Sequence, residues 1–501
     1  MDLAAGLISG FKVSLQYINL FYCFIGVLIG TLVGVLPGIG PTGAMAMLLP
    51  LTFSLSPTAA IIMLAGIYYG SMYGGSTTSI LVNIPGEPSS VVTCLDGYQM
   101  AKKGRAGPAL GISAMGSFIG GTISLIIMMF LAIPLAKAAL KFGPPEFFSL
   151  ICASMTLLTY LAKGSMIKAI IMAVLGLILS TVGIDLVTGS PRFAFGVPSL
   201  LDGIGFVPLT MGLFGISEVL INIEGPLERT IFESKISKIK NLLPNFNDWK
   251  KSFGPILRGS ILGFFLGILP GGGGILSSFV SYSIEKRISK KPESFGQGAI
   301  EGVAGPETAN NAGAGGAFIP LLVLGIPPNV VLAFLLGAFI IHGIAPGPTL
   351  ISQHPQIFWG VTASMYIGNI MLLVLNLPLI GLWVKVLKIP YRILMPLIIL
   401  FCIIGSYSLS YNIADVVIMF FFGIIGYILR KLNYEVAPLV MAFILGPILE
   451  TTFRQSLIMS DGKFSIFLER PISAVALLIA IFLLVSSGFS IFKKAKTKII
   501  E

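Results

Sequence analysis

The sequence predicts an all-α polytopic membrane protein, and three observations support this class. Hydrophobic residues make up 55% of the chain and charged residues 11%, whereas a soluble domain carries about 25% charged residues. No Asp, Glu, Lys or Arg occurs in residues 13–86 or in residues 308–384. Hydrocarbon disfavours each central charge by about 2.5–3.5 kcal/mol, so such runs are typical of the bilayer. Both runs are also rich in Gly, Pro, Ser and Thr, which predicts broken or re-entrant helices.

The length of the chain, 501 residues, limits the number of transmembrane segments. At roughly 20 residues a span plus loops, we expect about 10–13 transmembrane segments. The first apolar stretch, residues 17–36, should remain as a span, because no basic region and small-residue cleavage site precede it. Further candidate spans follow in order at residues 107–136, 147–162, 167–184, 206–221, 361–384, 393–414, 416–429, 437–449 and 471–492.

The net charge of +11 is distributed in short clusters between apolar segments. Examples are residues 102–105, 286–291, 430–431 and the tail 493–498. This is the positive-inside pattern of a membrane protein and argues against nucleic-acid binding. It predicts a cytoplasmic C-terminus. The four cysteines are widely spaced, with no CxxC pair, so neither a disulfide framework nor a zinc site is indicated.

Composition divides the chain into four parts. We expect a first membrane repeat half at residues 1–223 and a polar, basic cytoplasmic connector at residues 224–258. A second membrane repeat half should follow at residues 259–390, with C-terminal transmembrane helices and a basic tail at residues 391–501. The connector is the largest polar break, with seven basic and four acidic side chains.

An internal repeat supports two related halves, which we expect to be inverted. Residues 30–40 (GTLVGVLPGIG) resemble residues 263–273 (GFFLGILPGGG) at an offset of 233. Residues 75–85 (GSTTSILVNIP) resemble residues 317–327 (AFIPLLVLGIP) at an offset of 242. Paired apolar segments interrupted by Gly and Pro point to the binding site of a transporter.

The broken segments supply the predicted substrate-binding residues. Freed N–H groups at a helix start can hold an anion, and freed carbonyls can hold a cation. Two alternatives stay open: glycines often serve close helix packing, and Ser or Thr in a span often bonds to its own helix. The predicted residues are Pro37, Gly38, Gly40, Thr42, Ser76, Thr77, Thr78, Asn83, Pro270, Gly271, Gly272 and Gly273.

Glu307 is the only acidic or basic residue between Glu301 and Lys385. A carboxyl group at this depth is typical of a cation ligand or a protonatable group, and amide oxygens can complete such a site. We therefore predict cation coupling by Glu307, Thr308, Asn310 and Asn311. The alternative is a structural carboxylate that caps the Asn-rich turn. Sodium or a proton is the expected coupling ion, with no other cofactor or metal.

Other polar residues have more ordinary interpretations. The segment Asp96-Gly97-Tyr98 can be a gate, a docking element or a solvated turn. His342 and His354 lie in a Pro-rich loop that we expect to face outward, where it either contacts a binding protein or is a plain loop. No fixed cation falls in the core motifs. Acids near span ends are expected at the interface: Asp185, Asp202, Glu218, Asp415 and Glu450.

Several motifs occur in a characteristic order. They are LPGIGPT at residues 36–42, YGSMYGGSTTSILVNIPGE at 69–87, DGY at 96–98, PETANNA at 306–312 and PLLVLGIP at 320–327. Over residues 15–490 the chain resembles the large membrane subunit of the tripartite tricarboxylate transporters. One departure is Thr308, where that family often has Ser; both carry a hydroxyl group.

The resemblance implies a three-part system in the bacterial inner membrane. A periplasmic solute-binding protein would deliver a carboxylate to this chain, paired with a small four-helix membrane subunit. Transport of tricarboxylates or dicarboxylates would be secondary, driven by a sodium or proton gradient, and the chain would not be an enzyme. No P-loop occurs in the sequence.

Two rival functions were weighed against this expectation. A passive channel can share re-entrant glycine loops but would show no gradient-driven accumulation. An intramembrane hydrolase needs a nucleophile beside a base. The sequence contains no Gly-x-Ser-x-Gly, and its two histidines have no helical spacing to a suitable Ser.

Overall fold

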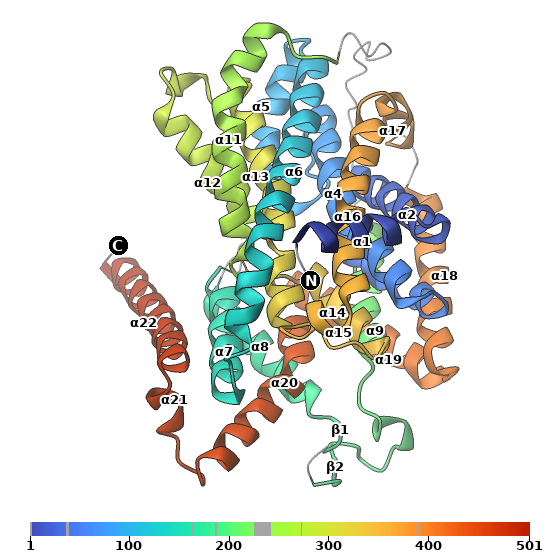
Figure 1. The fold of residues 1–501 in the computed structure, drawn as a ribbon, viewed down its shortest axis with the longest axis vertical. Helices are drawn as coiled ribbons and strands as arrows, with labels where there is room; N and C mark the ends of the chain where they lie inside the picture. The colour runs from blue at the N-terminus through green and yellow to red at the C-terminus, as the bar shows by residue number, and fades with distance from the viewer. Residues whose placement is uncertain are drawn as a thin grey trace.

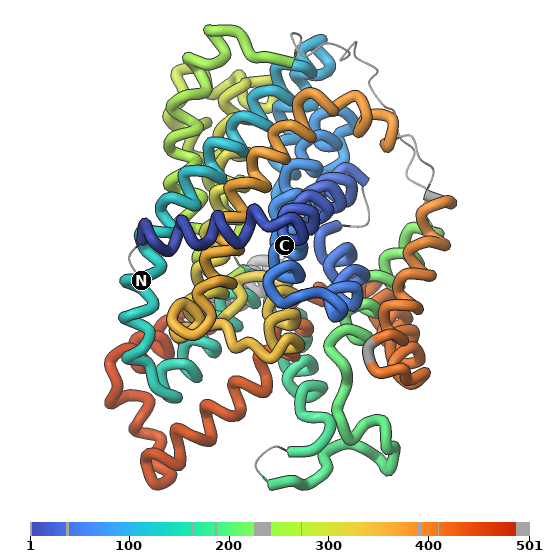
Figure 2. The backbone as a smooth tube through the Cα atoms, turned by 45° about the vertical axis from the view of Figure 1, so that its right-hand side comes forward, coloured from blue at the N-terminus to red at the C-terminus, as the bar shows by residue number. Residues whose placement is uncertain are grey.

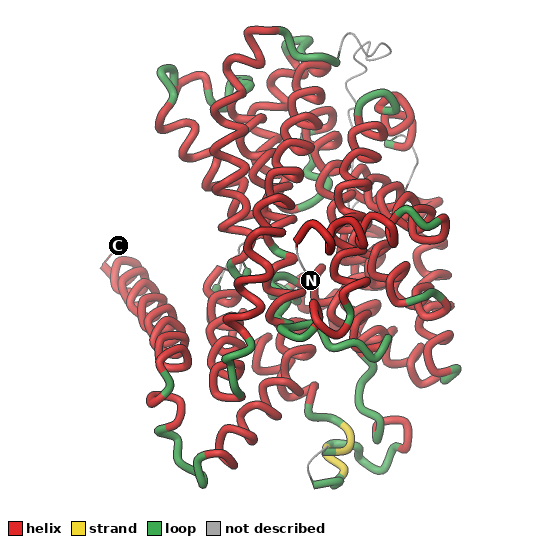
Figure 3. Tube along the Cα trace, viewed as in Figure 1, coloured by secondary structure: helices red, strands yellow, loops and turns green. Residues whose placement is uncertain are grey.

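The computed structural model describes residues 3–36, 40–161, 165–185, 188–224, 242–271, 273–387 and 391–500. Three predicted site residues, Pro37, Gly38 and Gly272, lie outside the described residues, as does much of the predicted connector. The described chain is almost entirely helical (Figure 3). Its strands are the antiparallel pair β1 (Gly183–Ile184) and β2 (Pro191–Arg192). The predicted all-α polytopic class is confirmed.

Within the described residues, six helical segments have the length and apolar composition of a span. These are α2 (Tyr17–Val35), α6 (Ala106–Ala139), the segment Phe206–Glu224, α16 (Pro355–Asn376), α19 (Ile413–Lys431) and α20 (Ala437–Met459). Shorter apolar stretches lie in α1 (Leu3–Ser14), α8 (Met166–Ser180), α14 (Val330–Ile341), α18 (Tyr391–Ser410) and α22 (Pro471–Ile500).

The remaining helices connect and support these segments. They are α3 (Gly40–Leu48), α4 (Pro57–Val82), α5 (Val91–Lys102), α7 (Pro144–Leu161), α11 (Phe246–Ile268), α12 (Gly273–Ile288), α13 (Glu301–Gly316), α15 (Leu350–Gln353), α17 (Ile380–Val386) and α21 (Ile466–Glu469). Helix α11 starts inside the range predicted as connector, where Asn245 and Asp248 form a capping box. The four-part division of the chain stays a prediction.

The helices form two groups in space (Figure 1). Helices α5, α11, α12, α13 and the first part of α6 stand together in the upper part of the view, and α7, α8, α20 and α21 in the lower part. Helix α1 crosses the bundle instead of following its long axis (Figure 2). It packs on α16 through Gly6 and Gly10, where an added Cβ would come within 2.3 Å of Trp359.

Helices α2 and α4 touch along a stripe of glycines. An added Cβ on Gly26, Gly30 or Gly34 would lie 2.3–2.6 Å from a backbone oxygen of α4, namely that of Met63, Ile67 and Ser71 respectively. Helices α11 and α13 touch in the same way. There, Cβ atoms on Gly259, Gly263 and Gly267 would lie 2.2–2.6 Å from the oxygens of Gly305, Ala309 and Gly313. Only small residues allow backbones to approach this closely.

The two glycine stripes repeat with the offsets seen in the sequence. Gly30 and Gly263 differ by 233 in residue number, as do the other two pairs of glycines. Their carbonyl partners, such as Ile67 and Ala309, differ by 242. One packing arrangement is therefore built twice, once by α2 and α4 and once by α11 and α13. These glycines therefore serve close helix packing, which was one of the two alternatives left open by the sequence.

This packing gives a stability prediction. We expect Gly263→Leu to lower the melting temperature of the purified protein, because the new side chain must push α13 away, and overpacking costs about 1–3 kcal/mol. Gly381→Leu is the matched control, since no atom lies within 4 Å of a Cβ at Gly381. Melting is measured by size-exclusion chromatography of heated samples, as the temperature at which the peak of monodisperse protein is lost. Equal melting of the two variants would contradict the tight contact.

The Pro-Gly phrases break the helices as the sequence predicts. After α11 ends, Gly271 and Gly273 take positive φ values of 77° and 43° before α12 continues. Gly40, which starts α3, has φ 64°. Later in the second half, a π-helix (Pro320–Leu324) ends at Gly325 with φ 72°, and α14 starts soon after. Glycine accepts these left-handed conformations without the clash of a Cβ, so the breaks are local properties of the sequence.

Candidate functional site

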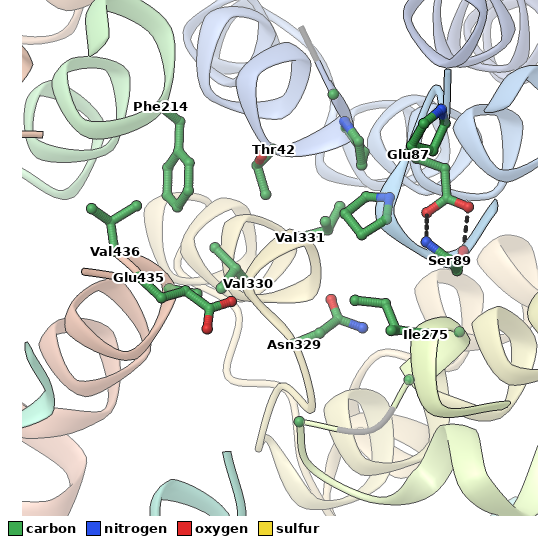
Figure 4. Close-up of a pocket in the computed structure, with 18 of the residues that line it drawn as sticks. Thr42, Glu87, Ser89, Phe214, Ile275, Asn329, Val330, Val331, Glu435 and Val436 are labelled. Carbon is green, nitrogen blue, oxygen red and sulfur yellow. Dashed lines mark hydrogen bonds between the residues drawn. The ribbon is translucent and has the colours of Figure 1, made fainter. Parts of the chain in front are cut away.

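A cavity of about 850 Å³ lies where the broken helices of both halves meet the turn between α19 and α20. Figure 4 shows residues that line this cavity. Helices α3, α12 and α14 all begin on its wall, at Gly40, Gly273 and Val330. The N-terminal end of a helix carries unpaired N–H groups and a partial positive charge. Three such ends around one cavity make a suitable environment for an anion.

Two hydrogen bonds across the cavity wall show how the halves are related. Asn310 Nδ2 donates to Glu87 Oε1 at 3.2 Å, and Asn329 Nδ2 donates to Tyr68 Oη at 3.1 Å. Glu87 and Asn329 are separated by the repeat offset of 242, and so are Tyr68 and Asn310. In each half, the loop residue (Glu87 or Asn329) is thus hydrogen-bonded to a helix of the other half (α13 or α4). Reciprocal contacts of this kind are produced by an approximate two-fold axis.

The cavity lies at this axis, because Tyr68, Glu87 and Asn329 are all among its lining residues. The two sides of the axis differ in charge. Glu87 corresponds to the neutral Asn329, and Glu307 corresponds to Ala65 at the same offset of 242. Both carboxyl groups of the repeat core therefore lie on one side of the axis. The corresponding positions on the opposite side are the amide of Asn329 and the methyl group of Ala65.

Glu87 is 3% exposed and fully engaged in hydrogen bonds. It accepts from the N–H of Ser89 at 2.9 Å, from the Ser89 hydroxyl and from Asn310. Glu87 belongs to one of the sequence motifs but was not among the predicted site residues. The repeat offers one signal in the sequence: at the offset of 242, Glu87 corresponds to Asn329, and Asn329 caps the start of α14.

Glu307 lies in the middle of α13 and is 1% exposed. Its two oxygens accept hydrogen bonds from Ser76 on α4 and Thr93 on α5. Asn311 donates to Ser117 at 2.7 Å and to the Glu307 carbonyl at 3.1 Å. Because α13 is continuous here, Glu307 does not cap an Asn-rich turn, and that part of the structural alternative was wrong. Among the described residues, no Lys or Arg pairs with Glu307 or with Glu87.

The predicted site residues separate into a cavity group and a carboxyl group. Gly40, Thr42, Gly271 and Gly273 line the cavity. Ser76 and Asn310 donate to the carboxyl groups of Glu307 and Glu87, and Asn311 donates to the backbone carbonyl of Glu307. Two further predicted residues bind backbone, because Thr78 donates to the Val35 carbonyl and Thr308 to the Ala304 carbonyl. Asn83 ends α4 with φ 59°, and Pro270 precedes the turn at Gly271. Thr77 is buried on α4.

Arg430 and Glu218 form an ion pair on the cavity wall that the sequence analysis missed. Arg430 was expected in a cytoplasmic cluster and Glu218 at the interface, and no fixed cation was expected at the core motifs. The structure adds a cation from outside these motifs and brings Glu218 to the site, since both residues line the same cavity as the Pro-Gly breaks. The two residues are 212 positions apart, and no local pattern connects them.

Asp96 is buried and serves as an anchor, so the solvated-turn interpretation was wrong. Its Oδ1 accepts from the backbone N–H groups of Gly296, Gly298 and Ala299 at 2.9, 2.7 and 2.8 Å. Its Oδ2 accepts from Tyr282 Oη at 2.9 Å. This carboxylate holds the loop that leads into α13, and therefore helps to place Glu307.

The other acids that were expected at the interface take part in peripheral contacts. Asp185 and Glu450 pair with Arg454, and Glu450 also pairs with Arg192 of β2. Asp415 accepts from Ser410, and Asp202 is exposed. His342 ends α14 and His354 precedes α16. Contact of this histidine loop with a binding protein stays a prediction.

Comparison with known proteins gives a family and two relatives. The family model described as "Tripartite tricarboxylate transporter TctA family" matches residues 20–441. An "Uncharacterized 52.8 kDa protein in TAR-I ttuC' 3'region" of Agrobacterium vitis is 51% identical over 481 residues, which cover 96% of this chain and 95% of the relative. An "Uncharacterized protein in TAR-II ttuC' 3'region" of the same organism is 56% identical over 212 residues, covering 42% of this chain and 88% of the relative. No solved structure matches the chain.

Proposed function

Because this chain belongs to the tripartite tricarboxylate transporter TctA family, we propose that it is the large permease subunit of a binding-protein-dependent secondary transporter that imports tricarboxylates or dicarboxylates. Family membership makes it a multi-pass membrane component of a transporter, not a member of an enzyme family. The observation that carries the substrate class is the cavity at which three helix N-termini converge. Unpaired N–H groups there suit carboxylate oxygens.

The coupling mechanism follows from the charges near the cavity. Glu87 lies in its wall, and an anion placed beside an ionised carboxylate is repelled, most strongly where water is scarce. A bound sodium ion or a proton removes this repulsion. The hydroxyl, amide and carboxyl oxygens around Glu87 and Glu307 are ligands suited to a hard cation and acceptors suited to a proton. We infer that cation and carboxylate bind together for this reason.

The partners and location are proposed on the family and the sequence. The family is that of a tripartite system, so the chain works with two partner subunits: a small four-helix membrane subunit and a periplasmic solute-binding protein. We place the assembly in the bacterial inner membrane. The positive-inside bias assigns Arg430, Lys431 and the C-terminus to the cytoplasm. Since Arg430 lines the cavity, we propose that the cavity opens toward the cytoplasm.

Uptake in cells tests the proposal. Cells that express all three components, with and without this subunit, are given radiolabelled citrate or malate in sodium buffer and in sodium-free buffer. We expect accumulation above the external concentration that needs this subunit and collapses when the sodium or proton gradient is removed. Uptake that only equilibrates would favour the passive channel. No uptake of either carboxylate would contradict the proposed substrate class.

A further inference from the structure

Arg430 is the one basic side chain among the described residues that line the cavity. The same wall carries three acidic residues, Glu87, Glu218 and Glu435. Figure 4 places Glu435 and Phe214 on one side of the cavity, and Asn329, Ile275 and Glu87 on the other. A carboxylate substrate in this cavity therefore meets a single fixed cation, in a wall that also carries the starts of α12 and α14.

Close helix packing brings Arg430 to this position. Helix α19 contacts a π-helix (Met211–Ile216) at Gly212, where an added Cβ would lie 2.3 Å from the Met419 carbonyl oxygen. Further along α19, the Arg430 guanidinium lies 5.9 Å from the centre of the Phe214 ring. π-Helical turns are uncommon and often occur at functional sites. Here the turn presents an aromatic face to the guanidinium, which favours cations.

The pairing of Arg430 leaves donors for another acceptor. Its Nη1 binds Glu218 Oε2, and its Nη2 reaches the Leu213 carbonyl oxygen only at 3.5 Å. A carboxylate can bind a guanidinium through two parallel hydrogen bonds, but Glu218 uses a single nitrogen. The side chains of Arg430 and Glu218 are 24% and 22% exposed. The pair is therefore accessible from the cavity and not sealed in the core.

Glu218 also has a second partner. Asn222, one turn along the same helix, donates its Nδ2 to Glu218 Oε1 at 3.0 Å. If Arg430 is taken by another carboxylate, the amide of Asn222 still holds Glu218. The exchange therefore does not leave the Glu218 carboxylate without a hydrogen bond.

We propose that Arg430 binds one carboxylate of the transported substrate and that Glu218 is the internal carboxylate which the substrate displaces. This assignment rests on the proposed transport function and names the residue that selects the charge of the substrate. A second carboxylate of the same molecule would meet the starts of α12 and α14, which line the same cavity. A molecule with two or three carboxylates can use Arg430 and a helix start together, whereas a monocarboxylate can use only one of them. Glu218 lowers the affinity for monocarboxylates by competing for Arg430.

The adjacent ion pair provides a matched control. Lys431 follows Arg430 directly and pairs with Glu224. Their side chains are 51% and 45% exposed, and neither residue is among those that line the cavity. Lys431→Gln therefore removes the same charge from the same helix end without touching the cavity.

The test compares Arg430→Gln, Arg430→Lys, Glu218→Gln and Lys431→Gln in the complete three-component transporter. Initial rates of radiolabelled citrate and acetate uptake give KM and maximal rate, and immunoblots of membranes give the amount of each variant. A lost charge-assisted pair corresponds to about a tenfold to hundredfold change, so Arg430→Gln should raise the KM for citrate by that factor. Arg430→Lys should lie between it and the wild type. Glu218→Gln should lower the KM for citrate and slow the maximal rate.

Opposite shifts in KM for Arg430→Gln and Glu218→Gln, with Lys431→Gln unchanged, would support the exchange. If both variants raise KM alike, the pair is merely structural and the assignment is overturned. An unchanged KM in Arg430→Gln would overturn it as well, while leaving the transport function intact. If the wild type accumulates no carboxylate, the transport function itself fails, and this outcome is recognised before any variant is compared.

Discussion

Glu307→Gln should abolish ion-coupled accumulation of the carboxylate while leaving the protein in the membrane. Glu307 is buried between α4, α5 and α13, with Ser76 and Thr93 donating to it. Gln has nearly the same shape but cannot become a negatively charged cation ligand, nor gain and lose a proton. If one coupled cation is lost at a membrane potential of 100 mV, about 2.3 kcal/mol of driving force is lost. This corresponds to roughly a fiftyfold lower accumulation ratio.

The measurement is the steady-state ratio of internal to external labelled citrate. Glu301→Gln is the control, because Glu301 lies at the start of the same helix and is not fully buried. Membrane abundance of both variants should match the wild type. An accumulation ratio in Glu307→Gln equal to the wild-type ratio would remove Glu307 from the coupling mechanism. Removal of sodium and collapse of the proton gradient in the wild type would then identify the ion.

Asp96→Ala should cause the largest loss of stability among single substitutions near the site. The carboxylate of Asp96 accepts from three backbone N–H groups and from Tyr282, and its side chain is completely buried. Alanine would leave these donors without their present partner; the Ala299 N–H is buried, and the donors of Gly296, Gly298 and Tyr282 are partly buried. Each buried unsatisfied polar group costs about 1–3 kcal/mol, so the total should be roughly 3 kcal/mol or more. Asp96→Asn keeps one oxygen acceptor and should lose less.

Thermal unfolding of detergent-purified protein checks this order. Asp202→Ala is the control, because Asp202 is an exposed acid in the segment between β2 and α9 (Phe206–Thr210), which lies at the opposite end of the molecule from α5 (Figure 1). We expect the melting temperature to fall in the order wild type and Asp202→Ala, then Asp96→Asn, then Asp96→Ala. A melting temperature for Asp96→Ala within error of Asp202→Ala would show that the anchor contributes nothing to stability.

Most of the fold class could be predicted from the sequence because it depends on local composition. The absence of charge in residues 13–86 and 308–384 is a requirement of hydrocarbon, whatever the helices contact. The breaks near Gly40 and Gly271 are equally local, since both residues adopt positive φ. The repeat offsets of 233 and 242 appear again in the packing of α2 on α4 and of α11 on α13. The family resemblance read from the motifs was confirmed by the match over residues 20–441.

The candidate site could be predicted only in part. Polar residues within the charge-free runs were visible in the sequence, and Glu307 was prominent because it is isolated. Glu87 and Arg430 were not selected, since each lies next to ordinary loop or basic residues in the sequence. The cavity brings them together from α19 and from the loop after α4. Neither composition nor periodicity contains information about such an encounter.

By itself, then, the sequence determined that this protein is helical, lies in the membrane, is built from two related halves with broken helices, and belongs to a transporter family. Tertiary structure alone decided that Asp96 is an anchor, that Glu87 meets Asn310, and that Arg430 with Glu218 faces the cavity. The physical reason is the range of the forces involved. The cost of placing a residue in hydrocarbon depends mainly on that residue, whereas hydrogen bonds and ion pairs act over a few ångströms between positions about 200 residues apart.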